Sequence, residues 1–409
     1  MNQFWSLVGY EYKKLLCKKS VILAGVLAFA ISIFSCFTMV IGSSNGQGNH
    51  YMENTSNYQA MLLDKSYEQA LAGRELDTEL ILEASRAYQK VDINVPTYGK
   101  TESYQKYGRP YRCIYYLVDS AYASSGSAFN VQDFQNISEE DASHYYAIRE
   151  HQLRENLTNH PLYSAADVEQ ILAMDKNVQK PFVMAYTDGY QRFFALSITT
   201  MMAILFLLSI IISPIFSGEY SQHTDSLILT SKNGKRFLVY AKLFVSFSIS
   251  VGLTFIFILS MYLTCMGIYG FEGTHAQIQL LIPLITYDWT LLETTGWLLV
   301  TSLLGGIFHT AICMSVSAYS KKTIMPMAVS TMLIMVGMFS GVQLPFFEEA
   351  RYFLPLMMGS FYDTLSTPLI IHWFGMGIPL YQAICIGACV MSMLLIIITI
   401  RGFRKHQVI

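Results

Sequence analysis

The chain has 409 residues, of which 53% are hydrophobic and only 14% carry a charge. Soluble proteins average about 25% charged residues, and the shortage here comes from several apolar runs of about 20 residues, long enough to cross a lipid bilayer as helices. The net charge of −2 and the absence of a long basic run argue against nucleic-acid binding.

The amino-terminal residues 1–20 predict an amphipathic helix that lies in the membrane interface. Trp5 and Tyr12 fall near one apolar stripe of this helix, and lysines follow it. A first transmembrane helix is then expected at residues 21–41. The alternative is a cleaved secretory signal, but the long region before the apolar run and the length of that run argue against it.

Residues 42–192 have the composition of a soluble domain, with 20 acidic and 13 basic side chains and many tyrosines. Within them, residues 77–91 predict a helix, because Leu80 and other apolar residues recur at helical spacing. Ser138 and Ser164 are each followed three residues later by aspartate, a pattern typical of the start of a helix. We therefore expect a mostly helical domain between the first two membrane spans.

The remaining sequence predicts five more transmembrane helices. The second is expected at residues 193–216, and a polar segment at 217–236 separates it from the third. Residues 237–401 then hold helices 3–6, at about 237–262, 297–318, 324–339 and 380–400, with two outer interfacial or re-entrant segments at 270–296 and 342–378, before a basic tail at 402–409. The predicted fold class is an all-α integral membrane protein with six transmembrane helices.

The positions of lysine and arginine predict that both termini are cytoplasmic, because basic residues gather in the loops that stay inside. With that orientation, the basic residues of the inner segments are Lys13, Lys14, Lys18, Lys19, Lys232, Lys235, Arg236, Lys321, Lys322, Arg401, Arg404 and Lys405. The two short outer segments hold only Arg351. Residues 42–192 then form an extracellular domain, and the expected location of the protein is the plasma membrane.

The polar segment 217–236 predicts a short helix parallel to the membrane. Glu219 suits the first turn of such a helix, where a negative charge interacts favourably with the helix dipole. Leu227 and Ile228 fall on a common side, and Asn233-Gly234 offers a left-handed stop. The alternative that composition leaves open is a plain polar loop between two spans.

This segment resembles the cytoplasmic coupling segment of ABC-2-type transporter permeases. In that family an acidic residue follows the second span, and a small helix, a turn with a basic residue and an alanine-lysine pair come next. The corresponding residues here are Glu219, Leu227–Thr230, Arg236 and Ala241-Lys242.

The resemblance extends to the layout of most of the chain. The amphipathic amino-terminal helix, the six spans, the large outer domain between the first two spans and the basic tail all match the family. Two positions depart from its pattern, because many relatives have glycine at the place of His223 and proline at the place of Lys232.

The resemblance implies an ABC-2, type V exporter-like fold in which this permease pairs with a second permease, as a homodimer or a related heterodimer, among membrane lipids. It also implies a separate ABC ATP-binding subunit, which would hold ATP and magnesium and drive the export of an amphipathic peptide, a lipid-like or a drug-like substrate. The residues that would couple the subunits are Trp5, Tyr12, Glu219, Asp225, Leu227, Ile228 and Arg236.

The sequence contains no GxxxxGK[ST] phosphate-binding loop. We therefore expect a permease subunit that is not an enzyme, with no catalytic residue, cofactor or metal site of its own. Any dependence on ATP must come from a partner.

An ion-coupled secondary transporter is the main alternative. Such proteins commonly carry buried carboxylates or broken helices, whereas the expected span cores contain no Asp, Glu or Arg. Lys242 lies close to the cytoplasmic end of its helix, and we expect its ammonium group to reach the interface. His309 in the fourth span is a candidate substrate contact, although a hydrogen bond to a neighbouring helix is the simpler interpretation.

Two other classes find less support in the sequence. A ligand-sensing membrane receptor would use the outer domain, but the sequence shows no soluble cytoplasmic output domain. FEEAR at 347–351 resembles the paired glutamates of one intramembrane protease family, but the segment is expected outside the membrane and without a supporting histidine helix. Cys385 and Cys389 would share a helix face, and we interpret them as small packing residues because no other metal ligand accompanies them.

Overall fold

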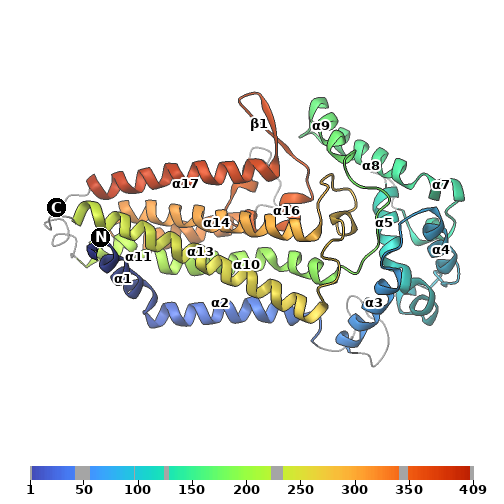
Figure 1. Cartoon of the computed structure of the whole chain (residues 1–409), viewed down its shortest axis with the longest axis horizontal. Helices are drawn as coiled ribbons and strands as arrows, with labels where there is room; N and C mark the ends of the chain where they lie inside the picture. The colour runs from blue at the N-terminus through green and yellow to red at the C-terminus, as the bar shows by residue number, and fades with distance from the viewer. Residues whose placement is uncertain are drawn as a thin grey trace.

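The computed structural model describes residues 2–41, 56–95, 97–123, 129–222, 234–339 and 349–405. The molecule is elongated, with a bundle of long helices at one end and a domain of short helices at the other (Figure 1). Both chain termini lie at the end of the bundle that is farthest from this domain (Figure 1). We call that end of the bundle the terminal end, and the end that meets the domain the domain end.

The bundle is built from long apolar helices and two short ones at its terminal end. Its helices are α1 (Asn2–Leu16), α2 (Lys19–Phe37), α10 (Asp188–Ile212), α11 (Pro214–Ser221), α13 (Gly234–Tyr269), α14 (Leu291–Tyr319), α15 (Ile324–Met338) and α17 (Leu380–Lys405). Among the described residues, five helical segments are long and apolar enough to cross a membrane, namely Lys19–Phe37, Asp188–Ser221, Phe237–Tyr269, Leu291–Tyr319 and Leu380–Arg404. The chain is therefore a helical, multi-pass membrane protein.

The predicted fifth span coincides with α15, which has 15 residues. At a rise of about 1.5 Å per residue this helix is about 22 Å long, shorter than the ~30 Å of a hydrocarbon core. Residues 340–348, which follow it, lie outside the described part of the chain. The described residues thus contain five helices of spanning length and a shorter apolar helix at the place of the predicted fifth span.

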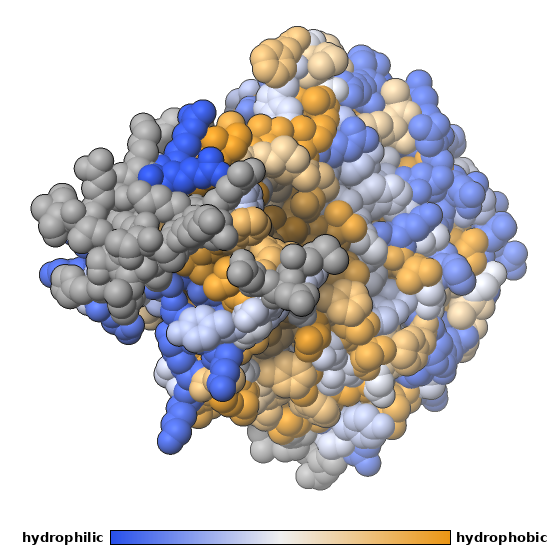
Figure 2. All heavy atoms as spheres, turned by 60° about the vertical axis from the view of Figure 1, so that its left-hand side comes forward, coloured by the Kyte–Doolittle hydropathy of each residue, from blue (hydrophilic) through white to orange (hydrophobic). Residues whose placement is uncertain are grey.

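The surface of the bundle is apolar, as a surface in contact with lipid must be. Figure 2 shows hydrophobic side chains over much of the visible bundle, whereas hydrophilic side chains dominate the side on which the domain lies. Ile22, Leu23 and Val26 of α2 are all exposed, as are Met393 and Leu394 of α17. Exposure of so large an apolar surface to water is unfavourable, so this surface fits contact with lipid.

Helix α10 lies at the centre of the bundle and packs against α2, α13, α14 and α15. Small residues allow the closest approaches. A Cβ atom on Gly306 of α14 would lie 2.7 Å from the hydroxyl oxygen of Thr254 on α13, and one on Gly305 would lie 2.8 Å from the carbonyl oxygen of Pro355. Glycine at these two positions therefore lets α14 pack directly against its neighbours.

The domain between the first two spans is helical, as predicted. Its helices are α3 (Asn57–Leu71), α4 (Thr78–Tyr88), α5 (Arg112–Tyr122), α6 (Val131–Gln135), α7 (Glu139–Ser143), α8 (Tyr145–Asn159) and α9 (Ala165–Asp175), with shorter turns η1 (Tyr98–Lys100), η2 (Tyr104–Gly108) and η3 (Arg109–Tyr111). The periodicity around Leu80 correctly predicted α4, whose apolar face is buried. The side chain of Ser138 accepts a hydrogen bond from the backbone N–H of Asp141, and that of Ser164 accepts one from the backbone N–H of Asp167. These bonds confirm the two predicted helix starts.

One arginine ties this domain to the bundle. The guanidinium of Arg149 on α8 is buried and donates to both carboxylate oxygens of Asp175, at 2.8 and 2.9 Å. Its other nitrogens donate to the backbone oxygens of Pro283, at 2.7 Å, and Ile285, at 3.0 Å, in the segment between α13 and α14. Since these bonds cross from the domain to the bundle, they fix how the two parts meet.

The segment between α13 and α14 differs from the prediction. We expected an interfacial or re-entrant helix over 270–296, but it holds only the short turn η4 (Ile278–Leu280) before α14 begins at Leu291. Thr290 and Glu293 form a capping box at that point, so α14 starts six residues before the expected Trp297. The capping pattern marks the start of α14, whereas hydropathy alone placed that start too late in the sequence.

The second outer segment, expected to be helical over 342–378, contains a β-hairpin. After η5 (Ala350–Phe353), η6 (Met357–Gly359) and α16 (Phe361–Leu365), strands β1 (Ile370–Trp373) and β2 (Met376–Pro379) pair antiparallel, with Ile370 opposite Pro379. Phe374 and Gly375 form the turn with positive φ angles of 53° and 82°. A two-residue turn of this kind matches the twist of the strands it joins, which explains why the chain reverses here.

Candidate functional site

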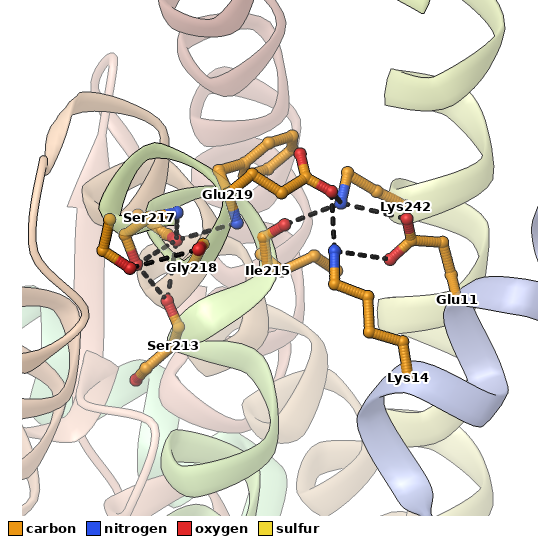
Figure 3. A network of polar contacts seen from close by, with 11 residues as sticks. Glu11, Lys14, Ser213, Ile215, Ser217, Gly218, Glu219 and Lys242 are labelled. Carbon is orange, nitrogen blue, oxygen red and sulfur yellow. Dashed lines mark hydrogen bonds and ion pairs between the residues drawn. The ribbon is translucent and has the colours of Figure 1, made fainter. Parts of the chain in front are cut away.

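Four charged side chains from three helices meet at the terminal end of the bundle (Figure 3). Glu11 and Lys14 come from α1, Glu219 from α11 and Lys242 from α13. Lys242 Nζ lies 2.7 Å from Glu219 Oε1 and 3.1 Å from Glu11 Oε1. Lys14 Nζ lies 2.6 Å from the same Glu219 oxygen and 3.8 Å from Glu11 Oε2. We call these residues the four-charge cluster.

The cluster is buried inside the protein. Glu11 is 1% exposed, Glu219 4% and Lys242 0%, and only the side chain of Lys14 reaches the surface. Buried charges must be paired, because an isolated ion in a medium of low dielectric constant is very costly. Two carboxylates and two ammonium groups balance here, so the cluster carries no net formal charge.

Lys242 is held by groups on all sides. Besides the two carboxylates, its ammonium group donates a hydrogen bond to the backbone oxygen of Ile215, at 2.7 Å. An ammonium group has three N–H donors, and these three acceptors match them. The ring of Phe216 lies 5.6 Å from the nitrogen and adds a cation–π contact. Contrary to the expectation from its position in the span, the ammonium group of Lys242 does not reach the surface of the protein, because its partners lie within the protein.

Lys14 forms the exposed edge of the cluster. Burial acts to lower its pKa, but the charges of Glu219 and Glu11 outweigh that effect, and the pKa of Lys14 lies above its ordinary value. Glu11 and Lys14 are three residues apart on one helix, a spacing that places both on the same face. The sequence of α1 therefore presents an acid and a base together to the other two helices.

A break between α10 and α11 positions Glu219. Pro214 is the first residue of α11, where its missing N–H leaves one backbone bond of the helix unmade. Ser317 of α14 fills the junction, because its hydroxyl donates to Ser213 O at 2.7 Å and accepts from the backbone N–H of Ser217 at 3.1 Å. The helix bearing Glu219 is thereby fixed to α14 as well as to α13.

Helix α1 is attached to α13 beyond the charges. The hydroxyl groups of Tyr12 and Ser248 share a hydrogen bond. The ring of Trp5 meets that of Phe244 edge to face, with 5.7 Å between their centres. Tyr12 thus faces α13, whereas Trp5 is about half exposed.

The structure describes four of the seven predicted coupling residues. Glu219 joins the four-charge cluster, and Tyr12 and Trp5 lie on α1 beside α13. Arg236 lies in the first turn of α13. The three remaining residues, Asp225, Leu227 and Ile228, lie outside the described residues, as do positions 223–233 in general.

Sequence reasoning did not identify Glu11 or its pairing with Lys242. A signal was present, since Glu11 is the single acidic residue among the first 50 and Lys242 the single Lys or Arg between positions 237 and 320. Lys242 has no acidic residue near it in the sequence, since none lies between positions 226 and 271, so an acidic residue beside another apolar span is a candidate partner for it.

His309 takes the simpler of its two expected roles. Its Nε2 atom lies 2.8 Å from the hydroxyl oxygen of Ser209, so it hydrogen-bonds across from α14 to α10. Both residues are buried. Within the ranges that the structure describes, no three His, Cys, Asp or Glu side chains come together in a way that could hold a metal ion.

No family model, no curated protein and no solved structure matches this chain.

Proposed function

We propose that this chain is the membrane-spanning permease subunit of an ATP-driven ABC exporter with an ABC-2 fold. In this proposal a separate ATP-binding subunit supplies the energy, a second permease completes the pathway, and the cargo is an amphipathic peptide, a lipid-like or a drug-like molecule. The protein would lie in the plasma membrane with both termini in the cytoplasm.

The observation that carries the proposal is the four-charge cluster. It joins α11, which continues the second span, to α13, the third span, and to the interfacial helix α1. In the resemblance described above, an acidic residue after the second span and a lysine at the start of the third are both part of the pattern. Their contact of 2.7 Å gives that pattern a physical reason, because each neutralises the other.

The cluster is suited to passing on a movement. Separating a buried ion pair leaves a charge without a partner, which costs about 3–5 kcal/mol. A push on α11 would therefore move α1 and α13 with it rather than break the contacts. Ser317 adds α14 to the same unit. A partner that moves this end of the bundle could thus act on three spans together.

The position of the cluster favours a partner at the terminal end. Helices α1 and α11, which carry three residues of the cluster, lie with both termini at the end of the bundle away from the domain of short helices (Figure 1). Along the sequence, the polar segment 217–236 follows the second span, and most basic residues of the loops fall in segments expected on the same side of the membrane as the termini. Because the sequence lacks a phosphate-binding loop of its own, an energy source at this end would be another polypeptide.

A second candidate is an ion-coupled transporter, and one observation favours it. Glu11 and Glu219 are buried carboxylates next to membrane helices, and ionisable groups in such places often carry protons during transport. Protonation of either carboxylate would upset the charge balance of the cluster and could move the same helices.

One purification separates the two candidates. The full chain, tagged and extracted from its native membrane in mild detergent, should bring down an ABC ATP-binding subunit in near-equal amount, with ATPase activity that vanadate inhibits. The matched control is an unrelated multi-pass protein with the same tag. A chain that purifies without any ATPase, under conditions that preserve other membrane complexes, would contradict the proposal and favour the ion-coupled transporter.

A further inference from the structure

A groove lies on the surface where the outer domain meets the segment that follows α13. Its volume is about 490 Å³, within the range of roughly 300–1,000 Å³ typical of ligand sites. Its lining includes Val183, Ala185, Phe271, His275 and Gln277. We call it the outer groove. It belongs to the domain end, far from the four-charge cluster, so the inference below does not rest on the proposed function.

One wall of the outer groove is an extended stretch of backbone. Val183 stands opposite Glu75 in an isolated antiparallel bridge. The neighbours of Val183 make the bonds of that bridge, since Leu76 N donates to Phe182 O at 2.7 Å and Met184 N donates to Arg74 O at 2.8 Å. In an extended chain alternate residues point to opposite sides. The N–H and C=O groups of Val183 therefore point away from Glu75.

The same alternation applies two residues further on, at Ala185. Within the described residues, no hydrogen bond uses the backbone N–H or C=O of Val183 or of Ala185. Both residues line the outer groove. Together they present two donors and two acceptors in the spacing of a strand edge, which is the arrangement that recruits another strand.

The groove also offers apolar contacts. The ring of Phe271 is 54% exposed and the side chain of Val183 is 44% exposed. A ligand in the groove would therefore meet two exposed apolar side chains. The amide of Gln277 is turned to the protein, because its nitrogen donates to the backbone oxygen of Gln179 at 2.9 Å and its oxygen is buried.

We propose that the outer groove binds a peptide in extended conformation, which adds a strand beside residues 183–185. At about 3.3 Å per residue, that stretch of backbone engages about three residues of the ligand. The lining contains no Asp, Glu, Lys or Arg, so the groove does not select a phosphate or a simple ion. Main-chain bonds supply the affinity in this mode, while Phe271 and Val183 favour apolar side chains.

Hydrogen–deuterium exchange on the full chain in lipid nanodiscs tests the proposal. The probe is a mixture of capped random pentapeptides at millimolar total concentration. We expect slower exchange, by several-fold, in fragments that cover residues 181–187. Phe182 N and Met184 N already bond within the protein, so overlapping fragments that end at Ala185 report on Val183 and Ala185. The comparison probe is the same mixture with every backbone nitrogen methylated, which removes the donors from both edges of the peptide and should protect nothing.

Two variants sharpen the test. Phe271→Ala removes the more exposed of the two apolar side chains and should weaken protection by the peptide mixture several-fold. The matched control is Phe374→Ala, at a fully exposed position in the hairpin turn outside the groove, which should change nothing. Ala185→Pro removes a donor of the edge and should abolish protection. Should this variant fail to fold, Phe271→Ala still decides.

Two results would overturn the proposal. The first is exchange at residues 181–187 that the unmodified peptides leave unchanged. The second is equal protection by the methylated peptides, which would mean that the groove binds apolar surface and not a strand.

Discussion

The ammonium nitrogen of Lys242 lies 2.7 Å from a carboxylate oxygen of Glu219, although the two residues are 23 positions apart in the chain. One begins the third span and the other ends the second, and both are buried. This contact joins two membrane helices at the terminal end of the bundle. It also fixes the amino-terminal helix, because Glu11 and Lys14 complete the charge balance.

Removal of the Lys242 charge should destabilise the whole bundle. Lys242→Met leaves two buried carboxylates with Lys14 as their only charged partner in the cluster, so we expect a loss of about 3–5 kcal/mol in the free energy of unfolding. Unfolding in detergent, followed by tryptophan fluorescence, measures it. Lys321→Met, at an exposed lysine, is the matched control and should stay within about 0.5 kcal/mol of the parent. A loss as small as that of the control would show that the cluster does not stabilise the fold.

The clamp of Arg149 should hold the domain of short helices to the bundle. Arg149→Met removes the bonds to Asp175, Pro283 and Ile285, so we expect a loss of about 3–5 kcal/mol and faster hydrogen exchange in residues 278–285. Arg154→Met is the matched control. Its exposed pair with Glu169 should contribute less than about 1 kcal/mol. Unchanged exchange in residues 278–285 would contradict this role for Arg149.

The domain of short helices should lose stability as the pH rises from about 5 to 8. Burial, and next the charge of Asp188, raise the pKa of Glu68 from 4.5 to about 8, against the opposing effect of Arg112. Between those two values the folded protein keeps a proton that the unfolded chain has released. Each pH unit in that window therefore costs at most about 1.4 kcal/mol of stability, and the loss ends above pH 8.

Thermal unfolding at a series of pH values checks this expectation. Glu68→Gln keeps the shape of the side chain without the proton, so its unfolding temperature should depend less on pH than that of the parent. Glu79→Gln, at an exposed carboxylate on α4, should behave like the parent. The same pH dependence in Glu68→Gln and in the parent would rule Glu68 out as its source.

The sequence predicted those features of the fold that depend on neighbours along the chain. Helix α4 follows from the spacing around Leu80, and the cap at Ser164 follows from an aspartate three residues later. The capping box at Thr290 is also formed by residues close together in the sequence, but we did not predict it because we expected an interfacial segment to extend past this point. The hairpin at Phe374-Gly375 was missed because apolar, proline-containing sequence near a membrane was interpreted as helix.

The candidate site was harder to predict because its contacts are not local. Glu219 stood out from its position after a span, and Lys242 from its place in an apolar helix. Their pairing with Glu11 depends on how α1 folds back onto α11 and α13, which no periodicity encodes. From hydropathy alone we expected Lys242 to extend toward water, because hydropathy does not show that two carboxylates lie within about 3 Å of its ammonium nitrogen.

Loss of the Glu219 charge should weaken the link between energy use and transport. In the complex with the proposed ATP-binding subunit, Glu219→Gln should lower transport per ATP hydrolysed by about 5- to 150-fold. This range corresponds to typical coupling free energies of about 1–3 kcal/mol. Insertion into the membrane should be unaffected, which blue native electrophoresis checks. Glu79→Gln makes the same chemical change on the outer domain and should leave the ratio intact. An unchanged ratio in Glu219→Gln would remove Glu219 from the coupling path.

The most direct test of the central claim is reconstitution into sealed vesicles, with accumulation of a panel of fluorescent amphipathic peptides and lipids as the readout. We predict uphill movement only when the ATP-binding subunit and ATP are both present, and none when the chain alone is given a proton or sodium gradient. Uphill movement by the chain alone on either gradient would contradict the account.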